Sequence, residues 1–239
     1  RKIQKIMKIF STEHLLVIAI TLLLCIFVPI VIRKKTNWHV GFRYGFGTLL
    51  LVNIVVYQIY RWKTGYWGAD QDLPMHLCAW ANVITALALF SKNNNLAAIA
   101  WCWVMMGSIN GLITPQLDNP FPEIPYIYFV IGHSGLMIAV TTLVYGLKIK
   151  PQPRAWIKVV AFSQVYFFTA LLVNYLTHAN YGYLDPHNEF RKQTILALFP
   201  AEGPWFHFAI QGVGAILFGI ALLPFVIERG VIAKKESSL

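Results

Sequence analysis

Residues 14–32 read HLLVIAITLLLCIFVPIVI, and this uninterrupted apolar stretch decides what kind of fold the chain can adopt. It contains no Lys, Arg, Asp or Glu, and its length matches the about 20 mostly apolar residues with which an α-helix crosses a bilayer. Basic residues precede it, as in a signal peptide, but it exceeds a typical signal-peptide core and lacks a small-x-small cleavage pattern. We therefore interpret it as a retained membrane helix.

Six further apolar segments follow the first one. Each predicts a helix of about spanning length, although Gly107, Gly111 and Pro115 weaken the end of the fourth segment. We predict an all-α, polytopic membrane helix bundle of about seven transmembrane helices, in a single domain over residues 1–239. The predicted helices cover residues 14–32, 41–60, 73–90, 96–114, 126–147, 155–178 and 204–227.

The composition also requires lipid as the solvent. Hydrophobic residues make up 57% of the 239 residues and charged residues only 13%, and the mean hydropathy is +0.56. A soluble domain carries about 25% charged residues. The net charge of +10 does not indicate a nucleic-acid partner, because Lys and Arg lie in short runs between apolar segments. Such basic loops are typical of contact with anionic lipid headgroups.

The charged residues are distributed unequally between the two membrane faces. The face that holds the C-terminus carries more Lys and Arg, which favours an N-terminus outside and a C-terminus inside. Most acidic residues and six of the seven histidines fall on the opposite face, which we call the site face. Those histidines are His14, His76, His133, His178, His187 and His207.

Several polar groups from different predicted helices reach a similar depth below the site face. Helical rise places Cys78, His133, Asn174, His207 and Gln211 about 4–10 Å below it, with His178 at the surface. Polar groups inside a membrane are costly and usually face a cavity, a partner or a pathway. This polar layer therefore predicts a functional cavity.

Cys78 is a candidate nucleophile if a base takes its proton. Residues two apart on a helix point to nearly opposite sides, which argues against His76 as that base, whereas His133 matches Cys78 in depth. Asn174 or Gln211 could orient the base or donate to an oxyanion. Alternatively, Cys78 is a small buried hydrophobic residue.

Two other types of site remain open. The polar layer could bind a transported or small ligand. The histidines and nearby carboxylates could instead bind zinc for lipid hydrolysis, but no HExxH and no His pair at i, i+4 occurs. We predict no metal site and no cofactor.

The motif Leu73-Pro74-Met75-His76-Leu77-Cys78 resembles the LP-x-HLC signature of the TMEM164/YwaF family of integral membrane proteins. Further matches follow in the same order over about residues 40–227: a Pro-rich loop before the segment with His133, then Asn174, Asn180-Tyr181-Gly182-Tyr183-Leu184 and Gly203-Pro204-Trp205.

This resemblance implies a phospholipid acyltransferase, as the animal branch of the family is regarded, with Cys78 as nucleophile and His133 as base. It implies membrane phospholipids or another acyl-lipid as substrate, and we expect a bacterial cytoplasmic membrane. The oligomeric state stays open. The supporting or substrate-binding residues that we predict are His76, Asn174, His178, Tyr181, Trp205, His207 and Gln211.

Overall fold

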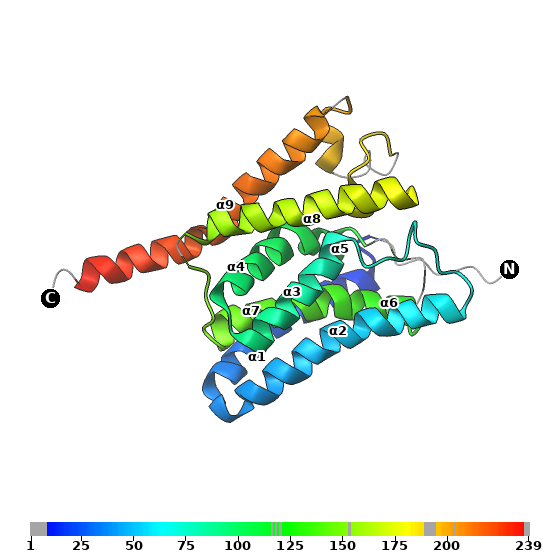
Figure 1. Ribbon diagram of the computed structural model, residues 1–239. Helices are drawn as coiled ribbons and strands as arrows, with labels where there is room; N and C mark the ends of the chain where they lie inside the picture. Colours follow the sequence, from blue (N-terminus) through cyan, green and yellow to red (C-terminus); the bar gives the residue numbers. More distant parts are fainter. Residues whose placement is uncertain are drawn as a thin grey trace.

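The structure is a computed structural model that describes residues 9–115, 117, 119, 121–152, 154–188, 195–202 and 204–236. Within these ranges the chain is helical and has no strand (Figure 1). The predicted all-α helix bundle is thus confirmed. Gly203 of the Gly203-Pro204-Trp205 motif lies outside the described residues.

Each of the seven predicted segments contains a helix, and π-helical turns interrupt the two helices at the centre of the bundle. The fourth segment runs through α4 (Asn94–Trp103), η2 (Val104–Ser108) and α5 (Ile109–Ile113). The fifth runs through α6 (Ile124–Val130), η3 (Ile131–Gly135), α7 (Leu136–Thr141) and η4 (Thr142–Gly146). The others are α1 (Thr12–Lys34), α2 (His39–Lys63) after η1 (Thr36–Trp38), α3 (Leu77–Ser91), α8 (Ala155–Thr177) and α9 (Trp205–Glu236), and 3₁₀ turns η5 (Tyr181–Tyr183) and η7 (Ile195–Leu198) lie between α8 and α9.

Six helices in the described residues are long and apolar enough to cross a membrane: 12–34, 36–63, 94–113, 124–146, 155–177 and 205–231. Helix α3, with 15 residues, is about 22 Å long at 1.5 Å per residue. The helices through residues 94–113 and 124–146 are the most buried, while α1, α2, α8 and α9 expose apolar side chains around them.

Alanines allow the inner helices to approach closely. Helices α3 and α4 pack on each other, and Ala81 and Ala88 of α3 and Ala97 and Ala100 of α4 are fully buried. Small residues at such contacts let two backbones come together, which is how helices associate in lipid, where no hydrophobic force drives them.

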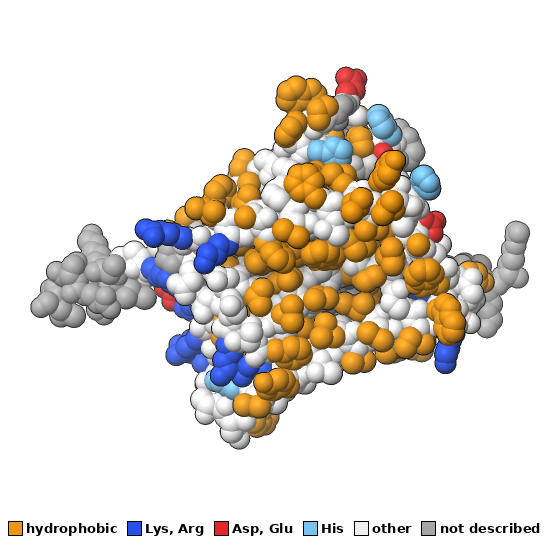
Figure 2. Space-filling model, in the orientation of Figure 1, with side chains coloured by type: hydrophobic (Ala, Val, Ile, Leu, Met, Phe, Trp, Pro, Cys, Tyr) orange, Lys and Arg blue, Asp and Glu red, His pale blue; other side chains and the backbone are white. Residues whose placement is uncertain are grey.

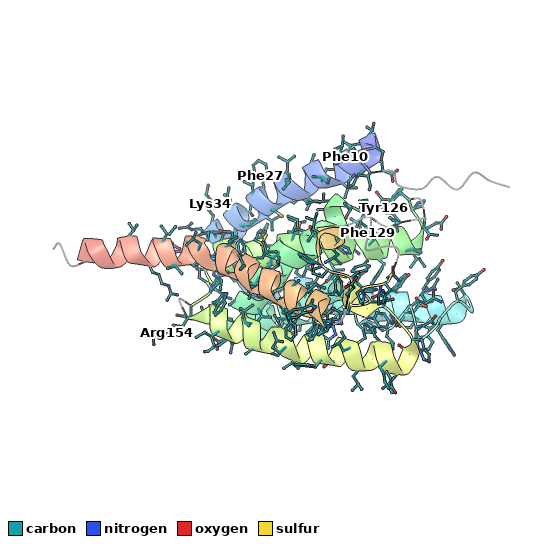
Figure 3. All side chains as sticks on the ribbon, turned by 90° about the horizontal axis from the view of Figure 1, so that it is seen from above. Phe10, Phe27, Lys34, Tyr126, Phe129 and Arg154 are labelled. Carbon is teal, nitrogen blue, oxygen red and sulfur yellow. The ribbon has the colours of Figure 1, made fainter. Side chains whose placement is uncertain are left out.

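The two ends of the bundle differ in charge. Figure 2 shows most Lys and Arg gathered at one end and His, Asp and Glu toward the other, with hydrophobic side chains between. Figure 3 places Lys34 and Arg154 at the first end, and Tyr126 and Phe129 toward the second, which is the site face. We call the first end the basic face.

The prediction that helix three begins at residue 73 is wrong. Helix α3 begins at Leu77, and His76 is its N-cap in an extended conformation, with ψ of 149°. Asp72 is buried and accepts hydrogen bonds from Arg61 Nε at 2.6 Å and Nη2 at 3.1 Å. Its carboxylate also accepts the N–H of Gly68 at 2.9 Å. A buried ion pair with α2 thus occupies Asp72, and this carboxylate does not cap α3.

The other end of α3 is closed by Arg43 of α2, a buried cation. Its Nε donates to the carbonyl of Leu89 at 2.6 Å and its Nη2 to that of Phe90 at 2.5 Å. These two carbonyls belong to the last turn of α3, where no backbone N–H follows to pair them. Arg43 therefore fixes the position of α3 relative to α2.

We expect Arg43→Met to lower the free energy of unfolding by about 2–4 kcal/mol, because two buried carbonyls lose their donors. Denaturant titration of the protein in detergent micelles measures this change. Arg33→Met, at an exposed position of α1, should stay close to the wild type. Equal stability of the two variants would contradict the proposed capping.

Candidate active site around Cys78

Cys78 is the second residue of α3, in a partly buried position. It therefore lies in the first turn of the helix, not about 7 Å below the helix start as the predicted helix bounds implied. The thiol lies beside the backbone N–H of Ala79. No side chain caps this helix start, and the partial positive charge of the first-turn N–H groups favours negative charge there.

Three tyrosines from three other elements lie close enough to Cys78 to interact with it electrostatically. They are Tyr128 of α6, Tyr166 of α8 and Tyr183 of η5. Burial, and to a lesser extent Cys78, raises the pKa of Tyr183. The surroundings of Cys78 are thus aromatic with polar ends.

His133 lies in the π-helical turn η3. Its Nδ1 is 3.0 Å from the carbonyl of Phe129, and since a carbonyl only accepts, Nδ1 carries the proton and Nε2 has a free lone pair. The ring stacks on Phe129 with centroids 4.5 Å apart. A methyl group on Gly111 would lie 2.5 Å from Nε2. The glycine that weakened the predicted fourth helix therefore makes room for this imidazole.

His76 belongs to the same cluster. Its Nδ1 accepts the N–H of Gly182 at 3.4 Å, which leaves the proton on Nε2. Burial, and secondarily His133, lowers the pKa of His76 to about 4, so the imidazole is neutral at pH 7. The argument that separated His76 from Cys78 required both to be helical, and it is wrong because His76 is extended.

Asn82 joins the two backbone segments that carry the candidate nucleophile and base. Its Nδ2 donates to the carbonyl of Cys78 at 2.8 Å and to that of Gly132 at 3.0 Å. Gly132 directly precedes His133, so one amide group holds the start of α3 against η3. In the described residues no hydrogen bond joins the Cys78 thiol to a histidine.

The segment after α8 is fixed by Asn174 and Tyr181. Asn174 Nδ2 donates to the carbonyl of Tyr181 at 2.9 Å, and its Oδ1 accepts the Tyr181 N–H at 2.7 Å. The Tyr181 hydroxyl accepts the N–H of Leu73 at 2.9 Å and donates to the carbonyl of Ala69 at 3.0 Å. Asn174 therefore positions η5 and does not bond to a histidine.

The remaining predicted residues are not joined to Cys78 by any contact among the described residues. His207 Nε2 bonds the carbonyl of Leu184 at 2.9 Å, and Gln211 pairs with Gln164 of α8 at 2.9 Å. Trp205 is 65% exposed. His178 is exposed at the end of α8, with φ of 56°. None of the described part of the chain gathers three His, Cys, Asp or Glu side chains that could hold a metal ion.

Tyr166 and Asn82 were not predicted from the sequence, and Gly111 was predicted only to weaken the fourth helix. A single Tyr or Asn within an apolar helix carries no local sign that its polar end meets another helix. Gly182 was quoted only as part of a motif, yet it has φ of +71°, a conformation in which glycine is strongly favoured.

The helices and their charge pattern define the class: a multi-pass integral membrane protein built as a helix bundle. The sequence profile of the TMEM164 family matches residues 9–222, and the chain belongs to this family. No curated protein and no solved structure matches the chain.

We expect Asn82→Asp to lower the free energy of unfolding by about 2–4 kcal/mol, since it replaces a donor by an acceptor facing two carbonyls. Asn110→Asp is the matched control, because Asn110 is exposed and bonds only carbonyls of its own helix. Denaturant titration in detergent compares the two. If Asn82→Asp is no less stable than Asn110→Asp, the bridge between α3 and η3 is not a stabilising contact.

Proposed function

We propose that the protein transfers an acyl chain between membrane lipids, with Cys78 as the nucleophile. The observation that carries the proposal is the position of Cys78 in the uncapped first turn of α3, bridged through Asn82 to the turn that holds His133. Burial disfavours the ionised form of the Cys78 thiol, so the attack requires a base close by.

The two histidines suit different roles. His133 has its proton on Nδ1, so its Nε2 lone pair can take the thiol proton. His76 has its proton on Nε2 and is suited to donating a hydrogen bond to substrate. No thiol–imidazole hydrogen bond is formed in the described residues, so the proposed step includes a closer approach of Cys78 and His133 when substrate binds, as is common for catalytic pairs.

The reaction proceeds in two balanced steps. Cys78 Sγ forms a bond to the ester carbonyl carbon while its proton passes to His133, and the carbonyl electrons move to oxygen. Collapse breaks the ester C–O bond, and the leaving alkoxide takes the proton from His133, giving a thioester and a lysolipid. A hydroxyl group of a second lipid then attacks the thioester, His133 takes its proton and returns it to the sulfur, and the acyl chain is transferred.

The proposed substrate is a glycerophospholipid. Its ester groups lie near the boundary between headgroups and hydrocarbon, and the N-terminal end of α3, which carries Cys78, points toward this boundary at the site face. Aromatic side chains typical of that boundary surround the site face, among them Trp62, Tyr66 and Tyr175, all strongly exposed. The excess of Lys and Arg on the basic face supports an orientation with that face in the cytoplasm and the site face outside.

We expect Cys78→Ala to abolish acyl exchange without loss of the folded state, because the small side chain is replaced by a smaller one at a partly buried position. Proteoliposomes with a phosphatidylcholine that carries a fluorescent acyl chain, plus a lysophospholipid acceptor, measure the exchange. Cys25→Ala, in the lipid-facing helix α1, is the control and should exchange acyl chains at the wild-type rate. Exchange by purified Cys78→Ala at that rate would rule out this mechanism.

The two histidines should respond differently to substitution. We expect His133→Gln to lower kcat by about 100-fold or more, as loss of a general base does. His76→Gln introduces a side-chain amide that can still donate and accept a hydrogen bond, so kcat of this variant should fall less. Initial rates of the same exchange reaction, with folding checked by size-exclusion chromatography, compare the variants, and a larger effect at His76 would reverse the assigned roles.

A further inference from the structure

Tyr166 of α8 is held rigidly beside the candidate active site. Its ring packs edge-on against Trp80 of α3, with centroids 5.4 Å apart, and lies tilted against Trp103 of α4, with centroids 5.7 Å apart. Trp103 is itself fixed by a hydrogen bond from Nε1 to the Ser163 hydroxyl at 2.8 Å. Only 7% of Tyr166 is exposed, so two indole rings determine where its hydroxyl points.

The hydroxyl of Tyr166 is buried and has no hydrogen-bond partner among the described residues. A buried tyrosine hydroxyl usually finds a partner, and an unpaired one is costly. The surrounding backbone nevertheless makes room for it: a methyl group on Gly182 would lie 2.7 Å from the hydroxyl oxygen. Glycine at 182 thus leaves open the space that this donor faces.

The hydroxyl faces the start of α3. It interacts with Cys78 and lies beside the backbone N–H of Leu77. Within the described residues, the N–H groups of Leu77 and Cys78 have no partner in the backbone, and no side chain caps them. An unpaired phenol and the unpaired amides of Leu77 and Cys78 therefore converge next to the thiol.

We propose that Tyr166 is a catalytic residue that donates its O–H to the oxyanion formed when Cys78 attacks an ester carbonyl, together with the N–H groups of Leu77 and Cys78. This inference rests on the proposed acyl transfer. When the Sγ–C bond forms, the carbonyl electron pair moves to oxygen, which then accepts these hydrogen bonds. When the pair returns and the C–O bond of the leaving alcohol breaks, the hydrogen bonds are released and Tyr166 keeps its proton throughout.

Tyr166→Phe tests the role, because it removes only the hydroxyl oxygen and preserves the ring between the two indoles. We expect kcat for acyl exchange in proteoliposomes to fall about 100-fold or more, the effect of losing one oxyanion donor, with KM nearly unchanged. The thermal unfolding midpoint should not fall, since the hydroxyl has no partner to lose.

Tyr181→Phe is the matched control for stability. The Tyr181 hydroxyl is buried like that of Tyr166 but forms two hydrogen bonds, so Tyr181→Phe should lower the unfolding midpoint. A fall of the same size in Tyr166→Phe would assign Tyr166 a structural role and overturn the proposal.

Alkylation of Cys78 measures the reactivity of the thiol separately from stabilisation of the oxyanion. A lipid with an iodoacetamide group reacts by displacement of iodide and forms no oxyanion, so it should label Tyr166→Phe at the wild-type rate. A p-nitrophenyl ester of a fatty acid passes through an oxyanion, so it should acylate this variant about 100-fold more slowly. An equal loss of rate in both reactions, or no loss of rate in either, would overturn the role of Tyr166.

The two proposals fail in different ways. If Cys78→Ala still exchanges acyl chains, the acyl-transfer proposal and the role of Tyr166 are both wrong. If Cys78→Ala is inactive while Tyr166→Phe turns over at the wild-type rate, only the role of Tyr166 is wrong.

Discussion

The structure depends on the rule that a carbonyl oxygen inside lipid needs a donor from within the protein. Polar side chains of one helix repeatedly supply that donor to the backbone of another. His14 reaches the carbonyl of Leu112 at 2.8 Å, Asn53 that of Tyr128 at 3.0 Å, and Trp101 that of Ala221 at 2.9 Å. Such bonds set the depth at which neighbouring helices meet, which packing of alanines alone leaves free to slide.

The start of α3 is different. At the basic face Arg43 pairs the last carbonyls of α3, whereas at the site face the first amides remain unpaired among the described residues. The carboxylate that precedes this helix is held by Arg61 of α2, so it does not neutralise those amides. A cluster of donors without an acceptor fits a site that receives negative charge only during a reaction.

Features that depend on one helix and its lipid contacts could be predicted from the sequence. The apolar run 14–32 lies within α1, because a helix in contact with lipid must be apolar. Helical rise predicted a similar depth for Cys78 and His133, and Asn82 joins the two segments that carry them. The start of α3 at Leu77 could not be predicted, because it is not visible in the sequence that Asp72 binds Arg61 of another helix. The surroundings of Tyr166 depend on residues from three other elements, and a local sequence pattern does not predict such contacts.

Because His133 lies in the π-helical turn η3, the direction of its side chain depends on how many residues precede it in the helix. Such a turn closes its backbone bonds over five residues, so it holds one residue more than an α-helical turn. Each residue in an α-helix turns the chain by about 100°. Loss of a single apolar residue between Ile124 and His133 would thus leave every polar side chain in the sequence but turn the imidazole away from Gly111 and α3. The geometry of the candidate active site therefore depends partly on the residue register of one helix.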